Sequence, residues 1–312
     1  MGAPDNDQAT DPPADLSAPS RDVPPAQPRS RWTRRLVRFV RTLVIGYVLL
    51  LGVMMLFENS LIYFPSVYPE GDWQPYGLMF EDAWFEAADG VKLHGWYVPH
   101  QQPRAVLLFA HGNAGNLSHR AEGIDTLVKR LRVSVMIFDY RGYGRSTGSP
   151  HEAGILADAR AARGWLADRA GVAESQIVLM GESLGGGVMV DLAAADGARG
   201  LILENTFSSM PDVAAYHYSW LPVRWLMRTR LDSLSKIGNY HGPLLQIHGD
   251  ADRIVPLTLA QRLYEVANPP KQFVLIPQGD HNDPRRGLAY QAMDQFLDTL
   301  PAESRASVRE GQ

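Results

Sequence analysis

The residues whose types and spacing are best suited to a chemical reaction lie in the stretch 176–187, which reads Q-I-V-L-M-G-E-S-L-G-G-G. Its centre matches the pattern G-x-S-x-G, with Ser183 between Gly181 and Gly185. A serine stands at the tip of a sharp strand-to-helix turn only if the residues two positions away lack side chains. The following helix then directs its N-terminus toward the hydroxyl. The pattern predicts a nucleophilic serine, although an isolated match also fits an idle serine in a glycine-rich turn.

A serine hydroxyl is a poor nucleophile and needs a base within hydrogen-bond reach. Of the nine histidines, His281 is the only one that follows the acid-bearing loop H-G-D-A-D-R-I-V-P at 248–256. An imidazole takes and returns a proton near neutral pH, so we expect His281 to be the base. His111 and His248 each end an apolar run and are expected to brace strand ends. The order serine, acid, histidine is typical of one class of catalytic triad.

Apolar runs that predict strands alternate with stretches that predict helices. The expected strands are 79–87, 91–98, 105–110, 133–139, 176–180, 200–204, 243–248 and 272–276, and the expected helices are 118–130, 151–169, 184–195, 257–267 and 286–300. Asp89-Gly90 predicts a hairpin between the first two strands. The pattern indicates an α/β fold with a mostly parallel central sheet and helices on both faces. Reactive groups gather at the carboxyl ends of such strands.

A glycine-bearing loop, 111–116, follows the strand 105–110 and reads H-G-N-A-G-N. We expect the backbone N–H of Asn113 in this loop and that of Leu184 to form an oxyanion hole beside Ser183. The sequence Asn116-Leu117-Ser118 matches a glycosylation acceptor. Because a glycan there would obstruct the site, we interpret it as a chance match.

Five segments together resemble the α/β-hydrolase superfamily: HGNAGN at 111–116, DYRGYGRS at 139–146, GESLGG at 181–186, HGDADRIVP at 248–256 and GDHN at 279–282. The resemblance covers 79–300 and is greatest to membrane-anchored serine hydrolases that include lysophospholipase-like and depalmitoylase-like members. It implies the α/β-hydrolase fold, with Ser183 as nucleophile, His281 as base and Asp252 as the acid that orients it. Asp250 is the alternative acid, although its position suits a turn-capping role.

Two further carboxylates lie close to these residues in the sequence. Asp280 adjoins the predicted base and is expected to point elsewhere. Glu182 adjoins the predicted nucleophile and is expected to be a structural partner rather than a catalytic acid.

The N-terminal part differs in composition from the rest. Residues 1–30 are rich in Pro, Ala, Asp and Ser, which predicts a disordered tail. The stretch 36–57 is long and apolar enough for a transmembrane anchor. Seven arginines lie between 21 and 41, whereas no Lys or Arg occurs from 42 to 91, so the N-terminus is expected in the cytoplasm and the remainder on the other side, the periplasm in a bacterium. A cleavable signal peptide and a buried amphipathic helix are the alternatives. The signal peptide is disfavoured because no small-x-small cleavage site follows the stretch. The amphipathic helix is disfavoured because the stretch has no polar face.

The rest of the chain divides into a linker at 58–78, the α/β-hydrolase domain at 79–300 and a polar tail at 301–312. Within the domain, 206–242 is expected to be a lid-like insertion rich in aromatic residues. These aromatics predict either an acyl pocket or a membrane-facing cap, or they pack a short helical insertion.

Several function classes find no support. The net charge of −4 offers no basis for nucleic-acid binding, and the chain has no cysteine. The glycines at 142, 144 and 148 lack dinucleotide-binding spacing, and no metal-ligand spacing occurs, so no cofactor or metal is expected.

The prediction is a membrane-anchored serine hydrolase acting on acyl esters or thioesters. A serine peptidase and a non-catalytic lipid- or partner-binding module remain alternatives, and haloalkane or epoxide chemistry is disfavoured because it needs an aspartate at position 183.

Overall fold

The computed structural model describes residues 1–2, 31–285 and 287–301. The predicted N-terminal tail and the polar C-terminal tail therefore lie almost entirely outside the described residues, as does position 286, where the last helix was expected to begin. The chain divides into two compact units, Met1–Leu51 and Gly52–Gln312.

Helix α1 (Arg31–Leu56) contains 26 residues, none of them buried. At 1.5 Å per residue it is about 39 Å long, which exceeds the ~30 Å hydrocarbon core of a bilayer. By length and composition it can cross a membrane, and a signal sequence would satisfy the same criteria.

The larger unit contains an eight-stranded sheet in the order β10-β9-β8-β7-β4-β6-β3-β2. The strands are β2 (Glu81–Glu86), β3 (Lys92–Val98), β4 (Ala105–Ala110), β6 (Val133–Phe138), β7 (Val178–Glu182), β8 (Gly200–Glu204), β9 (Leu244–Gly249) and β10 (Lys271–Ile276). Strands β2 and β3 form the expected antiparallel hairpin, β3 also pairs antiparallel with β6, and every other pair is parallel. The mostly parallel sheet is thus confirmed.

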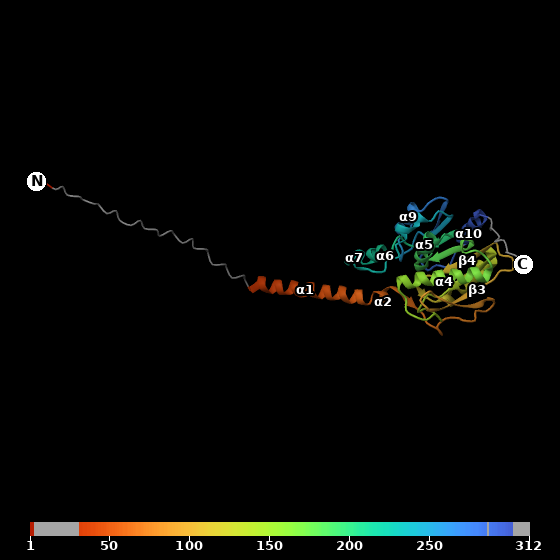
Figure 1. Ribbon diagram of the computed structural model, residues 1–312, viewed down its shortest axis with the longest axis horizontal. Helices are drawn as coiled ribbons and strands as arrows, with labels where there is room; N and C mark the ends of the chain where they lie inside the picture. The colour runs from red at the N-terminus through yellow and green to blue at the C-terminus, as the bar shows by residue number, and fades with distance from the viewer. Residues whose placement is uncertain (3–30, 286, 302–312) are drawn as a thin grey trace. The chain divides into compact units, whose positions relative to one another are not determined.

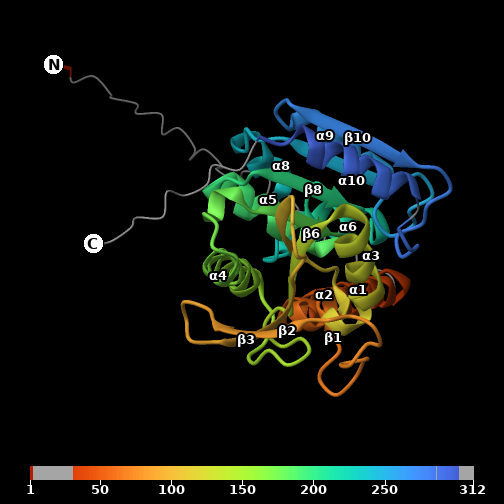
Figure 2. The ribbon, with the colours of Figure 1, turned by 90° about the vertical axis from the view of Figure 1, so that its right-hand side faces the viewer.

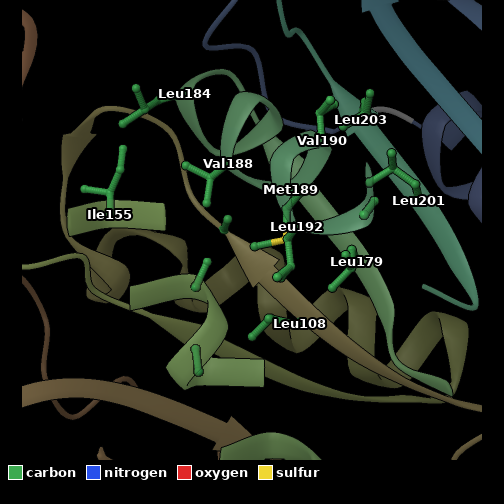
Figure 3. Packing of buried hydrophobic residues seen from close by; sticks show 14 of the residues in the cluster. Leu108, Ile155, Leu179, Leu184, Val188, Met189, Val190, Leu192, Leu201 and Leu203 are labelled. Atoms are coloured by element: carbon green, nitrogen blue, oxygen red, sulfur yellow. The ribbon is translucent and has the colours of Figure 1, made fainter. Parts of the chain in front are cut away.

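Helices cover both faces of this sheet (Figure 2). Helices α3 (Ala121–Leu131) and α10 (Gly287–Thr299) pack with one apolar cluster, and α4 (Glu152–Ala170), α5 (Leu184–Asp196) and α9 (Leu257–Val266) pack with the other. Strands β4 and β6 are buried at every position because both of their faces are covered. Figure 3 shows Val188 and Met189 of α5 among leucines of β4, β7 and β8. This packing fixes the helix that follows Ser183.

The segment 58–78, expected to be a linker, contains α2 (Glu58–Ile62) and β1 (Phe64–Pro65). Strand β1 pairs in parallel with β5 (Ala114–Gly115), which lies in the loop after β4 and is followed by the 3₁₀ turn η1 (Leu117–Arg120). A second 3₁₀ turn, η2 (Glu174–Gln176), precedes β7, so β7 begins two residues later than expected.

The expected insertion at 206–242, which we call the lid segment, contains α6 (Met210–His217), α7 (Val223–Leu226), α8 (Ser233–Lys236) and the 3₁₀ turn η3 (Ile237–Asn239).

Candidate active site

Ser183 lies at the turn between β7 and α5 with φ 52° and ψ −114°. Positive φ is unfavourable for a residue with a side chain, and such strain often occurs at functional sites. The turn requires its glycines, because a Cβ at Gly185 would lie 2.0 Å from the Ala110 carbonyl oxygen and one at Gly181 would lie 2.4 Å from the Gly185 oxygen. The Ser183 carbonyl accepts a hydrogen bond from Thr206 Oγ1 at 2.9 Å. The sharp turn predicted from G-x-S-x-G is therefore present.

Gly185→Ala is expected to lower the free energy of unfolding by about 3 kcal/mol, because backbone atoms block the added methyl group. The matched control is Gly164→Ala in helix α4, where the nearest atom is 3.8 Å away and the change should stabilise the helix by about 1 kcal/mol. Chemical denaturation of both variants measures the two effects, and equal stability of the two would contradict the clash.

His281 links Ser183 to Asp252. Its Nε2 lies 2.9 Å from Ser183 Oγ, and its Nδ1 lies 2.7 Å from Asp252 Oδ2. The other oxygen of Asp252 accepts hydrogen bonds from the backbone N–H groups of Ile254 at 2.9 Å and Val255 at 2.7 Å. The carboxylate is buried and held on both oxygens, so it fixes which imidazole nitrogen carries the proton. The structure thus brings together the three side chains that we selected from the sequence.

The other two aspartates nearby have different partners. Asp250 Oδ1 accepts a hydrogen bond from the backbone of Gln278 at 2.6 Å, which ties two loops together. Asp280 pairs with Arg253, whose hydrogen bonds lower the Asp280 pKa to about 2. Only Asp252 therefore contacts the His281 ring among these three carboxylates.

His111 and His248 brace strand ends as expected. His111 Nδ1 lies 2.7 Å from the Gly112 carbonyl oxygen, and His248 Nε2 donates to the Val255 carbonyl at 2.9 Å. His248 also lies 3.5 Å from Asp252 Oδ2. Burial lowers the pKa of His248 below its ordinary value, and the Val255 carbonyl and Asp252 only partly oppose this effect.

His248→Gln is expected to make folding less sensitive to acid. Because the folded-state pKa of His248 is lowered, the unfolded chain binds more protons below pH ~6.5, and stability falls as the pH drops through that window. The glutamine amide can still donate to Val255 but does not titrate. As the pH falls from 7 to 5.5, the free energy of unfolding should decrease in both proteins, and the decrease should be smaller in the variant by up to about 1 kcal/mol. Denaturant titrations at several pH values test this, and parallel curves would contradict it.

The loop 111–116 lies directly beside the serine. A Cβ at Gly112 would be 3.5 Å from Ser183 Cβ. Within the described residues, the backbone N–H groups of Asn113 and Leu184 donate to no other protein group. Unpaired N–H groups near a serine hydroxyl are of the kind that can stabilise a developing oxyanion.

Side chains and the segment 62–70 hold this loop. The Asn113 side chain donates to the carbonyl of Ile62 at the end of α2 and accepts from Tyr143 Oη at 2.9 Å. Asn116 is fully buried, and its amide donates to the carbonyls of Ser66 at 3.2 Å and Glu70 at 2.8 Å. Together with the β1–β5 pairing, these bonds attach residues 62–70 to the loop that carries the Asn113 N–H.

Asp139 supports the same loop from the other side. Its Oδ1 accepts a hydrogen bond from the Leu117 N–H at 2.8 Å and lies 3.4 Å from His111 Nε2. All of these groups are buried, so the loop is fixed at both of its ends.

A cavity of about 560 Å³ adjoins His281. Its lining includes Glu182, Glu204, Arg120 and Arg285, which form a chain of ion pairs. Burial raises the pKa of Glu182, but the positive charges of Arg120 and Arg285 outweigh it, so this pKa lies below the ordinary value. Glu182 is thus a member of an ion-pair chain, as expected of a structural partner, and the cavity offers a polar environment.

Several supporting residues were not identified from the sequence. Asn205 follows β8; its amide donates to the His281 carbonyl at 3.0 Å, and its Oδ1 accepts from the Gly249 N–H at 3.1 Å. Thr206, Asn205 and Tyr143 act through contacts with segments distant in sequence, so no local pattern distinguishes them. Tyr143 and Thr206 lie in segments that the sequence singles out, 139–146 and 206–242, but nothing in those segments points to either residue.

The described part of the chain contains no cluster of three or more His, Asp or Glu side chains that could hold a metal. The arrangement of hydroxyl, imidazole and carboxylate next to two free N–H groups is suited to nucleophilic attack on an acyl carbon.

Comparisons with known proteins indicate the same fold. A family model described as alpha/beta hydrolase fold matches residues 105–236. The uncharacterized protein Rv2307c of Mycobacterium tuberculosis is 42% identical over 238 residues, which cover 75% of this chain and 84% of that protein. The alpha/beta hydrolase domain-containing protein WAV2 of Arabidopsis thaliana is 32% identical over 303 residues, covering 86% of this chain and 98% of that protein. Among solved structures, the Pyrococcus furiosus esterase Pf2001 has a TM-score of 0.63 at 18% identity and covers 76% of this chain and 97% of that chain, a similarity of fold.

Proposed function

Because the chain belongs to the α/β-hydrolase family, we propose that it is a membrane-anchored serine hydrolase that cleaves carboxylic ester or thioester bonds. The observation that carries the proposal is the position of His281, with one ring nitrogen 2.9 Å from Ser183 Oγ and the other 2.7 Å from Asp252. A module that only bound a lipid or a partner would not need all three groups in hydrogen-bond contact.

In the first step, Ser183 Oγ attacks the acyl carbon while its proton passes to His281 Nε2. The carbonyl oxygen becomes an oxyanion that the N–H groups of Asn113 and Leu184 stabilise. Asp252 stabilises the imidazolium that forms. The alcohol or thiol then leaves with the proton from His281, and the acyl group remains on the serine.

In the second step, water gives a proton to His281 and attacks the acyl-serine. The tetrahedral intermediate collapses, the carboxylic acid leaves, and the proton returns to Ser183 Oγ. The polar cavity beside His281 is where we propose that the leaving group lies, because His281 must protonate that group.

We propose α1 as the membrane anchor, because none of its residues is buried and most of them are apolar. The charge asymmetry of its flanks would place the catalytic unit on the non-cytoplasmic side. This location favours acylated or lipid-like substrates.

The experiment that tests the activity is turnover of a panel of esters, thioesters and amides of graded acyl length by the detergent-solubilised full chain. Hydrolysis of esters or thioesters, with a preference among chain lengths, is the expected result. If well-folded protein cleaves only amides, the peptidase alternative is correct instead. If it cleaves nothing and fails to react with a fluorophosphonate, it is a binding module.

A further inference from the structure

The lid segment exposes four large aromatic side chains within ten residues. Tyr216, Tyr218, Trp220 and Trp225 are 63%, 52%, 60% and 89% exposed, and we call these four the aromatic lid surface. Exposed aromatic groups concentrated in one segment mark a site of interaction, because water solvates their apolar faces poorly.

Hydrogen bonds tie this segment to the end of the proposed anchor. The buried carboxylate of Glu58 accepts from the backbone N–H groups of Thr229 at 2.7 Å and Arg228 at 2.9 Å. Arg228 also donates through Nη2 to the carbonyl of Met55, which belongs to the last turn of α1. Burial raises the pKa of Glu58, but the hydrogen bonds from Thr229 and Arg228 outweigh it, so this pKa lies below its ordinary value.

Met55, Glu58 and the lid segment belong to the same compact unit, and Figure 1 shows α2, α6 and α7 at one end of it. Trp225 is three residues from Arg228, whose side chain reaches Met55. If α1 crosses a bilayer, Met55 lies where the chain leaves it. Trp225, at one end of the aromatic lid surface, is then within a few residues of that interface.

We propose that the aromatic lid surface docks on the bilayer that holds the anchor, with its aromatic rings in the headgroup region. This inference rests on the anchoring part of the proposed function. Tryptophan and tyrosine prefer that region because one side of each ring is apolar and the other carries a polar group. Arg228 and Arg230, both exposed, follow the aromatic residues in the chain and can contact lipid phosphates.

Continuity with the anchor favours a bilayer over a protein partner. A protein partner would have to approach a surface that the contacts of Arg228 and Glu58 hold next to the point where the chain leaves the bilayer. The bilayer is already present at that point and needs no additional binding energy to be brought there.

The surface also adjoins the candidate site. His217 at the end of α6 lies 2.8 Å, through Nε2, from the carbonyl oxygen of Ile254. The N–H of Ile254 in turn donates to Asp252 at 2.9 Å. A bilayer docked on the aromatic lid surface therefore lies next to the loop of the proposed catalytic acid, where a substrate dissolved in the bilayer meets the enzyme.

The absence of cysteine allows a direct test in the full chain. Single cysteines are introduced by Trp225→Cys, Trp84→Cys and Leu50→Cys, and each is labelled with a small fluorophore. Trp84 is a matched control, because it is a 52% exposed tryptophan on strand β2. The labelled proteins are reconstituted into phosphatidylcholine vesicles with brominated acyl chains, which quench fluorophores inside or at the surface of the bilayer.

The inference predicts strong quenching at positions 50 and 225 and almost none at 84. Quenching at 50 alone would overturn the docking of the lid while leaving the anchor in place. No quenching at 50 would overturn the anchor and the docking with it. Ester turnover and fluorophosphonate labelling, measured on the same variants in detergent, report separately on whether the hydrolase proposal stands.

Discussion

Replacing Ser183 with alanine is expected to lower kcat/KM for ester hydrolysis by roughly 10⁵- to 10⁶-fold and to abolish fluorophosphonate labelling. The reason is the loss of the atom that forms the acyl-enzyme; the oxyanion donors and substrate binding then leave only a small residual rate. Because the alanine Cβ occupies the space of the serine Cβ, the turn and the fold should persist. The unfolding midpoint is measured alongside the rates.

The proposed acid provides a matched pair of variants within one loop. Asp252→Asn should lower kcat by about 10⁴-fold, because the amide no longer orients and stabilises the imidazolium. Asp250→Asn removes the same charge two residues away but leaves His281 untouched, since Asp250 contacts the Gln278 backbone. The Asp250 variant should keep most of the activity. Equal losses in both variants would disprove the assignment of Asp252.

A further effect on catalysis is expected from the segment 58–70, which follows α1. A chain that begins at Glu58 should retain ester turnover in solution, whereas one that begins at Gly71 should lose at least about 10²-fold in kcat, comparable to the loss of an oxyanion-hole donor. The longer deletion removes β1 and the carbonyls of Ser66 and Glu70, to which the buried Asn116 amide donates. An unsatisfied buried amide costs about 1–3 kcal/mol, so the loop should relax and displace the Asn113 N–H.

Point variants separate this positioning effect from a general loss of stability. Asn116→Ala removes the same amide from an intact chain. Asn268→Ala is its control, because the Asn268 amide also joins two carbonyls, those of Gly238 at 2.6 Å and Tyr240 at 2.9 Å, in another part of the fold. Both should lower the unfolding midpoint, but only Asn116→Ala should lower kcat. Full activity of Asn116→Ala and of the chain starting at Gly71 would contradict a role in catalysis.

Much of the fold was predictable because buried parallel strands carry continuous apolar runs. Strands β4 and β8 have the boundaries expected from the sequence, and the parallel order followed from the alternation with helices. The antiparallel pairing of β3 with β6 was not predicted, since it joins segments about 40 residues apart and no local pattern records it. The start of β7 was predicted two residues too early. Gln176 directly precedes the apolar run, but it belongs to the 3₁₀ turn η2 rather than to the strand.

The candidate site, too, could be predicted from the sequence only in part. Ser183 was identifiable because its turn requires glycine two residues away on either side, and His281 because no other histidine follows the acidic loop. Asp252 was selected over Asp250 by resemblance alone, since both occupy the same loop and only their hydrogen bonds distinguish them. The support given by residues 62–70 was not foreseen, because the pairing of β1 with β5 consists of backbone bonds that any sequence can form.

The buried amide of Asn116 also determines which cells can produce this protein in active form. In a eukaryotic secretory pathway, the sequence Asn116-Leu117-Ser118 is an acceptor for an oligosaccharide on the nascent chain. In the folded protein the same nitrogen is fully buried and donates to two carbonyls, so a sugar attached to it is incompatible with the folded conformation of the loop 111–116. Expression through such a pathway should therefore yield a glycosylated, misfolded fraction, and a bacterial host should yield none.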